Sequence, residues 1–435
     1  MNSTITTLNR GYQMISGELG LLSHITKLPT MNADPNLVAF GIWPCDTSVF
    51  SQEKFGGRSS GCGASWEHAV LTTIGETIER YCPSIYNLEE ATFASYRELG
   101  KPAVHPSEYA LFHEEQYKFY EEDGYQMYRF TEDRKLHWFP CKDLTTGKES
   151  YVPGAFIYLP WTGEDEWINI NTSTGLAAHS DFYRAILLGL YECIERDSFT
   201  MTWAHNMFRE KIRITGEIQD YLDNLFPTSY EWHFFDINYD LGVPAVFGIC
   251  FGQADFGPFV AVGTSARGTY GEAFKKVTQE IGQAVSYFRY LLAEKKDWHP
   301  TDDFNEIQNF EDHSIFYLKR PELQHAFDPW RNAKPTKKID LHEPAPEGGT
   351  KAELQKLLKL FRRKGYNVLV RDLTLPDVRD CGYYATSTFV PQLLQMNGAY
   401  PFYFLGGKRL YEVPKALGLS NRDYHSLNKF PHPFP

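Results

Sequence analysis

Several familiar signatures are missing from this chain of 435 residues. No apolar run approaches the roughly 18 residues that a membrane-spanning helix needs. The first residues, MNSTIT, lack the basic and apolar regions of a secretory signal. The seven cysteines are scattered, with no Cys-x-x-Cys pair and no Cys/His spacing that fits a zinc site. These absences predict a soluble protein of the cytoplasm with reduced thiols.

Positive charge is outweighed by negative charge, with 43 Lys and Arg against 55 Asp and Glu. The formal net charge is −12, and the run from Lys359 to Lys364 forms the solvated side and end of one helical pattern. An acidic chain without a basic patch is not expected to bind nucleic acid. The sequence contains no Gly-x-x-x-x-Gly-Lys-Ser/Thr loop and lacks the protein-kinase motif set, which excludes both of those ATP-binding classes.

Helical and strand-like segments alternate along the chain, and 42% hydrophobic residues can supply a large core. Apolar periodicity predicts helices over residues 66–81, 181–199 and 270–292, and a further helix around 354–361 that stops at Gly365. Short apolar runs predict strands over residues 244–251, 259–263 and 366–370. The alternation predicts a mixed α/β fold.

Loops rich in small or turn-forming residues separate these segments. A Gly/Ser-rich loop over residues 56–65 leads into the first helix, and a second loop, 171–175, opens the next. Residues 327–349, rich in proline and lysine, predict a surface loop. The chain ends in PHPFP, which cannot be a helix or an inner strand because three of its five residues lack a backbone donor.

One short pattern recurs on the three main helices. Glu-x-x-Glu-Arg occurs at residues 76–80 and again at 192–196, and Glu-x-x-Gln follows at 280–283. A spacing of three residues places both oxygen-bearing side chains on the same helix face, opposite the apolar stripe in the first two helices and at its edge in the third.

A glutamate opposite an apolar stripe usually faces water, but residues 185–191 are apolar nearly all round and predict a buried helix. Its carboxylates would then need partners, because a buried unpaired charge is unfavourable. The small residues before these helices would let backbone N–H groups approach an anion. Carboxylates brought together repel one another, and Mg²⁺ relieves that repulsion while bridging carboxylates to phosphates. The residues predict a magnesium–nucleotide site built from three helices.

In order and spacing, these motifs resemble those of the YcaO family over roughly residues 55–435. The family pattern has a Gly-rich start, then Glu-x-x-Glu-Arg, then Glu-x-x-Glu-Arg-Asp (here ending at Asp197), then Glu-x-x-Gln. The resemblance implies a YcaO-type α/β fold with mixed sheets and helices and an acidic helix cluster that binds ATP and Mg²⁺. It also suggests a division into an N-terminal segment (1–54), a catalytic core (55–412) and a C-terminal tail (413–435).

The resemblance implies a role for each motif residue. The side chains expected to hold the metal ions and position ATP are Glu76, Glu79, Glu192, Glu195, Glu280 and Gln283. Arg80 and Arg196 are candidates for phosphate contacts, or for salt bridges to neighbouring acids. Ser65 is a further candidate for ATP binding.

The sequence also departs from the family pattern. Gly61-Cys62-Gly63 lacks the lysine of a Gly-Lys-Gly start, Thr174 stands for an asparagine and Val285 for an arginine. Arg58 and Arg289 are candidate substitutes for the missing positive charge.

The Pro-x-Pro-x-Pro ending is typical of family members that form azolines. It implies an ATP-dependent cyclodehydratase that closes Cys, Ser or Thr of a ribosomal precursor peptide into thiazoline or oxazoline by phosphorylating the backbone amide. The carboxylate of Pro435 is a candidate catalytic base. Implied partners are the precursor peptide, a leader-binding protein resembling ubiquitin-activating enzymes, a flavin dehydrogenase that oxidises azolines, and a second copy in a homodimer.

Alternatives remain open from the sequence. With sulfide or an amine as nucleophile, the same fold would form a thioamide or a macrocyclic amidine. An unrelated ATP-dependent ligase would turn over without any peptide, and a non-catalytic subunit would bind no nucleotide.

Overall fold

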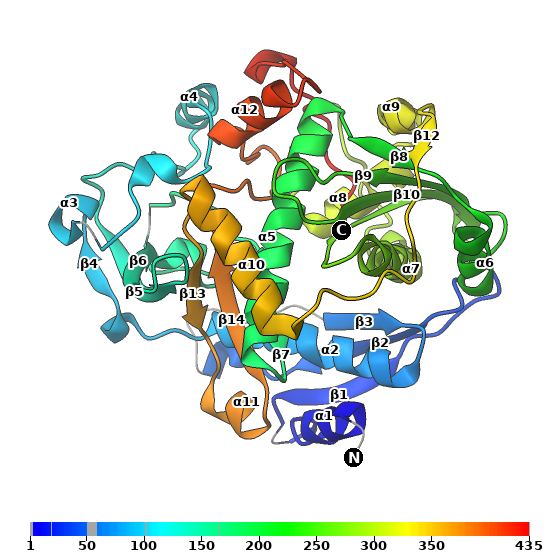
Figure 1. Cartoon of the computed structure of the whole chain (residues 1–435), viewed down its shortest axis with the longest axis horizontal. Coiled ribbons are helices and arrows are strands. Elements are labelled where there is room, and N and C mark those ends of the chain that lie inside the picture. The colour runs from blue at the N-terminus through cyan, green and yellow to red at the C-terminus, as the bar shows by residue number, and fades with distance from the viewer. Residues whose placement is uncertain (1–2, 19, 50–58, 101, 165, 435) are drawn as a thin grey trace.

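The computed structural model describes residues 3–18, 20–49, 59–100, 102–164 and 166–434. The chain folds into mixed α/β architecture with three sheets arranged around one long central helix, α5 (Phe182–His205) (Figure 1). The predicted fold class is therefore confirmed. Among the described residues, no helix is long and apolar enough to cross a membrane.

The first sheet is antiparallel and consists of β1 (Leu22–Lys27), β2 (Val38–Pro44) and β3 (Ser59–Gly63). Helix α1 (Ser3–Tyr12) and helix α2 (Trp66–Tyr81) pack near it. Residues 59–63 were expected in a loop, and that expectation is wrong. A Cβ on Gly61 would lie 2.3 Å from the backbone nitrogen of Thr73, so the glycine allows strand β3 to pass directly against α2. This sheet joins residues on both sides of position 54, and the proposed domain boundaries stay a prediction.

The second sheet has the order β11-β10-β9-β8-β12. Its centre is a hairpin of β10 (Ala245–Ala254) and β11 (Gly257–Ala266), which confirms the two strands predicted there. The sheet is completed by β9 (Glu231–Asp236), β8 (Glu210–Ile212) and β12 (Pro335–Lys337). Helix α7 (Tyr270–Glu294) covers the hairpin, with α6 (Gly216–Leu225) and α8 (Phe310–Lys319) nearby.

The third sheet has six strands: β4 (Thr92–Ala94), β5 (Leu136–Asp143), β6 (Glu149–Pro153), β7 (Leu176–His179), β13 (Leu369–Asp372) and β14 (Tyr384–Phe389). Helix α5 packs on β7 and β14 and also contacts β11, so it links this sheet to the second. The loop at 171–175 leads into β7 rather than directly into α5. A Cβ on Gly189 would lie 2.5 Å from the carbonyl oxygen of Gly175, so the glycine allows α5 to approach this loop.

The remaining helices are α3 (Tyr96–Leu99), α4 (Glu114–Glu122), α9 (Asp328–Arg331), α10 (Gly349–Lys364), α11 (Pro376–Asp380) and α12 (Lys408–Ala416), of which α10 packs on α5 (Figure 1). Helix α10 ends at the left-handed Gly365, as the sequence predicts. The surface loop expected at 327–349 instead contains α9 and β12.

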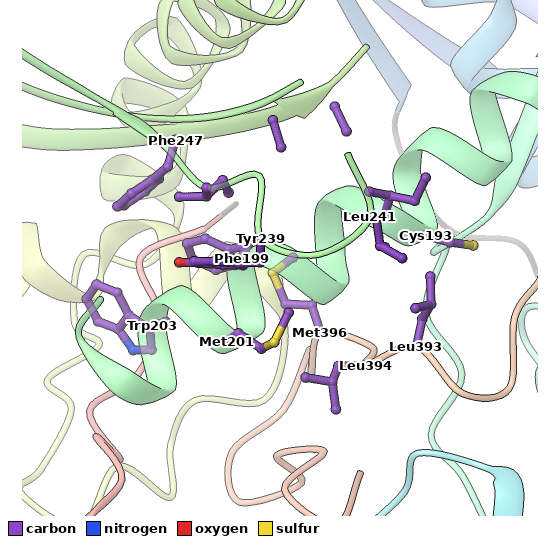
Figure 2. Close-up of a cluster of buried hydrophobic side chains, with 14 of the residues drawn as sticks. Cys193, Phe199, Met201, Trp203, Tyr239, Leu241, Phe247, Leu393, Leu394 and Met396 are labelled. Carbon is purple, nitrogen blue, oxygen red and sulfur yellow. The ribbon is translucent and has the colours of Figure 1, made fainter. Parts of the chain in front are cut away.

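The largest hydrophobic core among the described residues surrounds α5 from Ile186 to Ala204. Figure 2 shows side chains of α5, among them Phe199 and Trp203, meeting Phe247 of β10 and the loop residues Leu393, Leu394 and Met396. Up to residue 434, where the description ends, the tail has no helix or strand after residue 426, as predicted, yet it is not a solvated extension. Residues 431–434 are buried and join this core.

Candidate nucleotide and metal site

The first Glu-x-x-Glu-Arg motif lies on the part of α2 that faces β7. Arg80 is held by Glu76, with Nη2 at 2.7 Å and Nε at 3.1 Å from Oε1. The Oε1 atom of Glu79 accepts the backbone N–H of Ala178 in β7 at 3.0 Å. Burial, reinforced by the negative charges of Glu76 and Glu192, raises the pKa of Glu79 well above its usual range.

The second motif occupies the middle of α5. Glu192 Oε2 accepts the backbone N–H of Gly175 at 3.0 Å, and Oε1 lies 3.2 Å from Arg196 Nη2. Glu195 is only 4% exposed and accepts hydrogen bonds from β11, from Thr264 Oγ1 at 3.0 Å and from the backbone N–H of Ala266 at 3.2 Å. Burial raises the pKa of Glu195 to about 7 despite the nearby guanidinium of Arg196.

The third motif lies on α7. Lys276 Nζ is 3.2 Å from Glu280 Oε1, while Glu280 Oε2 is buried with no hydrogen-bond partner among the described residues. Gln283 Nε2 donates to Ser60 in β3, to its hydroxyl at 2.8 Å and to its carbonyl at 3.2 Å. Gln283 therefore holds α7 against the first sheet.

The glutamates influence one another across the three helices. Glu192 raises the pKa of Glu79, and Glu280 raises that of Glu195. The carboxylates of Glu76, Glu79, Glu192, Glu195 and Glu280 thus form a continuous row from α2 through α5 to α7, here called the acidic chain. Ser65 lies at the opposite end of α2 from Glu76 and Glu79, where its hydroxyl caps the helix by accepting the N–H of His68 at 3.3 Å. Pro435 lies outside the described residues.

Three contacts of the motif glutamates are not predicted by the sequence. Lys276 pairs with Glu280, Thr264 donates to Glu195, and Arg267 Nη1 lies 3.9 Å from Glu195 Oε2. The lysine could have been found, because a residue four positions before Glu280 lies on the same helix face. The contacts from β11 depend on how the sheet meets α5, which no local pattern encodes.

The proposed substitute Arg289 is already neutralised elsewhere. Arg289 Nη2 lies 2.7 Å from a carboxylate oxygen of Asp34 and 2.7 Å from one of Asp255. Neither partner is one of the motif glutamates. Arg58 lies outside the described residues.

The donor set fits Mg²⁺ in its chemistry. All five carboxylates offer hard oxygens, and Glu280 Oε2 has no hydrogen-bond partner among the described residues. Burial, and after it the neighbouring motif glutamates, raises the pKa of Glu79 and Glu195. Within the described ranges, no three His, Cys, Asp or Glu side chains already converge as a metal-ligand group. The glutamates are instead held by Arg80, Arg196, Lys276 and backbone N–H groups. A polyphosphate could lie beside them only with a divalent cation to offset the added negative charge.

Comparison with known proteins places this arrangement in a family. The family model described as YcaO cyclodehydratase, ATP- and Mg²⁺-binding, matches residues 60–394. No curated protein sequence matches the chain significantly.

Several solved structures share the fold. A heterocyclase in complex with substrate and cofactor has a TM-score of 0.77 at 20% identity, covering 99% of this chain. The chain covers 57% of that protein, so it spans little more than half of its length. YcaO from Methanopyrus kandleri, bound with AMPPCP and Mg²⁺, gives 0.64 at 16% identity, covering 91% of this chain and 92% of the other. The E. coli microcin synthetase McbBCD complex with pro-MccB17 bound gives 0.61 at 17% identity, covering 94% and 96%.

At these identities the likeness establishes the fold, and the family match extends over most of the chain, including all three Glu motifs. The predicted YcaO-type fold is confirmed. The description of the family as ATP- and Mg²⁺-binding agrees with the predicted cofactors. The chain belongs to the YcaO family.

Proposed function

We propose that this chain is an ATP- and Mg²⁺-dependent cyclodehydratase that converts Cys, Ser or Thr of a ribosomal precursor peptide into thiazoline or oxazoline. The observation that carries the proposal is the acidic chain formed by α2, α5 and α7 in a protein that matches the YcaO family over residues 60–394. The Pro-x-Pro-x-Pro ending favours azolines over the thioamide and amidine alternatives.

In this reaction the side-chain thiol or hydroxyl of the peptide loses its proton to a base and adds to the preceding amide carbon, so that the carbonyl electron pair moves to the amide oxygen. ATP supplies the phosphoryl group that turns the amide oxygen into a leaving group. Departure of phosphate and loss of the N–H proton then close the C=N bond, and ADP and phosphate are released. The protein contributes charge stabilisation and positioning, as is general for phosphoryl transfer.

Within this proposal, Mg²⁺ would be held by the motif side chains Glu76, Glu79, Glu192, Glu195, Glu280 and Gln283. Arg80 and Arg196 would bind phosphate oxygens, and Ser65 would contact the nucleotide. In the structure Arg80 pairs with Glu76 and Arg196 pairs with Glu192, which fixes each guanidinium beside the acids. The N–H groups of Ala178 and Gly175 orient Glu79 and Glu192. The carboxylate of Pro435 is kept as the proposed base that accepts a proton.

The proposed partners follow from the same family. One matched relative is part of a microcin synthetase complex that has its pro-peptide bound. We infer that this chain also works in the cytoplasm with a separate leader-binding protein and a precursor peptide. A flavin dehydrogenase and a second copy of the chain are further proposed partners.

The test combines the full chain, ATP, Mg²⁺, its leader-binding partner and a Cys/Ser/Thr-rich precursor peptide. Peptide mass and released phosphate are followed together. We expect the loss of one water per ring, one phosphate per ring, and abolition of both by Glu192→Gln. The matched control is Glu347→Gln, which changes an exposed glutamate in the loop before α10 and should keep full activity.

Other outcomes separate the alternatives. Exchange of oxygen for sulfur would indicate a thioamide synthetase. ATP hydrolysis with an unchanged peptide would contradict cyclodehydration. Turnover without any peptide would indicate a small-molecule ligase.

A further inference from the structure

The C-terminal tail is fixed in the core through its backbone. Because Pro431 and Pro433 have no N–H to donate, the tail cannot pair as a regular strand, and its carbonyl groups need donors from elsewhere. Three side-chain donors from α5 and α8 bind three consecutive carbonyls instead: Trp203 Nε1 to Phe430 at 2.8 Å, Tyr317 Oη to Pro431 at 2.7 Å, and His313 Nδ1 to His432 at 2.8 Å. All three donors are at most 3% exposed.

His432 in turn positions Phe434. Its ring stacks on that of His313, with centroids 3.8 Å apart and an interplanar angle of 7°. Nε2 lies 2.7 Å from the carbonyl oxygen of Asn397 and must donate, so Nδ1 is free to accept the backbone N–H of Phe434 at 3.3 Å. Burial lowers the pKa of His432 to about 4, which keeps this neutral tautomer at physiological pH.

Phe434 in turn covers Arg196. The guanidinium carbon lies 4.2 Å from the centroid of the Phe434 ring, and Phe434 is 4% exposed. The edges of the guanidinium meet Glu192 at 3.2 Å and the sulfur of Met396 at 3.7 Å. Glu195 is a competing partner, since its Oε1 atom lies 3.9 Å from Arg196 Nε.

We propose that Phe434 is a positioning residue that stacks on Arg196 and holds its guanidinium toward Glu192 and the nucleotide site. His432 and His313 keep the ring in place. The function of this tail therefore depends on the residues between the prolines, and not on the prolines alone. The inference rests on the proposed function, because it takes Arg196 to bind a phosphate of ATP.

The physical reason is that an aromatic face attracts a desolvated guanidinium and restricts its rotation. Leucine fills a similar volume but offers no π face. Phe434→Leu should therefore weaken the binding of AMPPCP with Mg²⁺ by about 3- to 30-fold, measured by calorimetry on the full chain. Phe430→Leu is the matched control, because Phe430 packs near Phe304 and His325 and should leave the Kd unchanged.

A second comparison tests whether the effect passes through Arg196. In an Arg196→Lys background the planar cation is absent, so Phe434→Leu should add little further loss. Tyr317→Phe removes one anchor of the tail and keeps the ring, so it should shift the Kd in the same direction by a smaller factor. This milder variant decides the question if Phe434→Leu does not fold.

Each result has one meaning. Equal losses for Phe434→Leu and Phe430→Leu, or a full additive loss in the Arg196→Lys background, would overturn the inference. A wild-type Kd for Phe434→Leu would do the same while leaving the proposed function intact. If the wild-type chain binds AMPPCP but forms no azoline, only the proposed function fails. If it binds no nucleotide with Mg²⁺, both fail.

Discussion

Two residues of one motif have different surroundings in α5. Glu195 is held by β11 at the acidic chain, whereas Asp197 is fully buried and binds Arg409 through both carboxylate oxygens, at 3.0 and 2.7 Å. Arg409 also binds Asp240, so its charge connects α5, α12 and the loop after β9. The aspartate of the Glu-x-x-Glu-Arg-Asp motif thus serves packing between elements.

The first prediction concerns the ion pair of Asp197 and Arg409. Arg409→Met should lower the free energy of unfolding by about 3–5 kcal/mol, because Asp197 is left as a buried charge without its partner. Urea unfolding measures the change. Arg379→Met is the control, since the pair with Asp372 is half-exposed and should contribute about 0–1 kcal/mol. Equal losses in the two variants would contradict the assignment.

The second prediction concerns pH. His432 has its pKa lowered from 6.5 to about 4, and burial also lowers that of His313 well below its usual range. Above pH 6.5 both histidines are neutral in the folded and unfolded chain, so their stabilising contacts are fully present. Below it the unfolded chain binds protons that the folded chain does not, and stability falls by about 1.4 kcal/mol per pH unit for each histidine.

His313→Asn isolates the contribution of His313 to this pH dependence of stability. Its amide can still donate to the carbonyl of His432, but it does not titrate. The variant should lose less stability than the wild type between about pH 6.5 and about pH 4, measured by urea unfolding at several pH values. Other buried histidines are common to both proteins and cancel in the comparison. Identical slopes would show that His313 is not held neutral by the fold.

At the scale of elements, close approach decides where several segments lie. Gly189 brings α5 against the loop at Gly175, whose N–H orients Glu192. We predict that Gly189→Ala lowers both stability and nucleotide affinity, because its methyl group would meet the Gly175 carbonyl oxygen at 2.5 Å. Thermal unfolding and AMPPCP binding measure the two effects.

Gly216→Ala is the matched control at the start of α6. A Cβ there meets nothing within 4 Å, so the substitution should be neutral or stabilise by up to about 1 kcal/mol. If both variants behave alike, helix propensity rather than close approach explains the result.

The elements that the sequence predicts well are those with a local signal. The helix expected at 66–81 has those bounds in the structure, because an apolar stripe follows the capping hydroxyl of Ser65. The hairpin β10–β11 follows from two apolar runs separated by turn residues. Strand β3 was missed because Gly61 belongs in a strand only through its contact with α2. The last turns of α5, after residue 199, were also missed, since they depend on partners far away in the chain.

The same distinction applies to the site. Spacing alone puts Glu76 with Glu79, and Glu192 with Glu195, on one helix face. It cannot show that Glu195 is held by β11 or that Gln283 binds Ser60, because these contacts arise from the packing of sheets.

At the scale of the whole molecule, the acidic chain joins elements from all three sheets. A ligand bound there should stabilise the entire fold, by about 2.7 kcal/mol at about 100 times its Kd. We predict that ATP with Mg²⁺ raises the thermal unfolding temperature and that a chelator removes the effect. Glu195→Gln should abolish the increase, while Glu347→Gln should keep it. An increase that survives chelation would argue against metal-dependent binding.

The packing around the tail also has an optical consequence. Trp203, whose indole N–H binds Phe430, lies face to face with Trp330, with centroids 5.1 Å apart and an interplanar angle of 4°. Two stacked indoles in a dry environment couple electronically and emit at short wavelength. Release of the tail should therefore change the near-ultraviolet circular dichroism of this pair and shift the emission of its two indoles to the red.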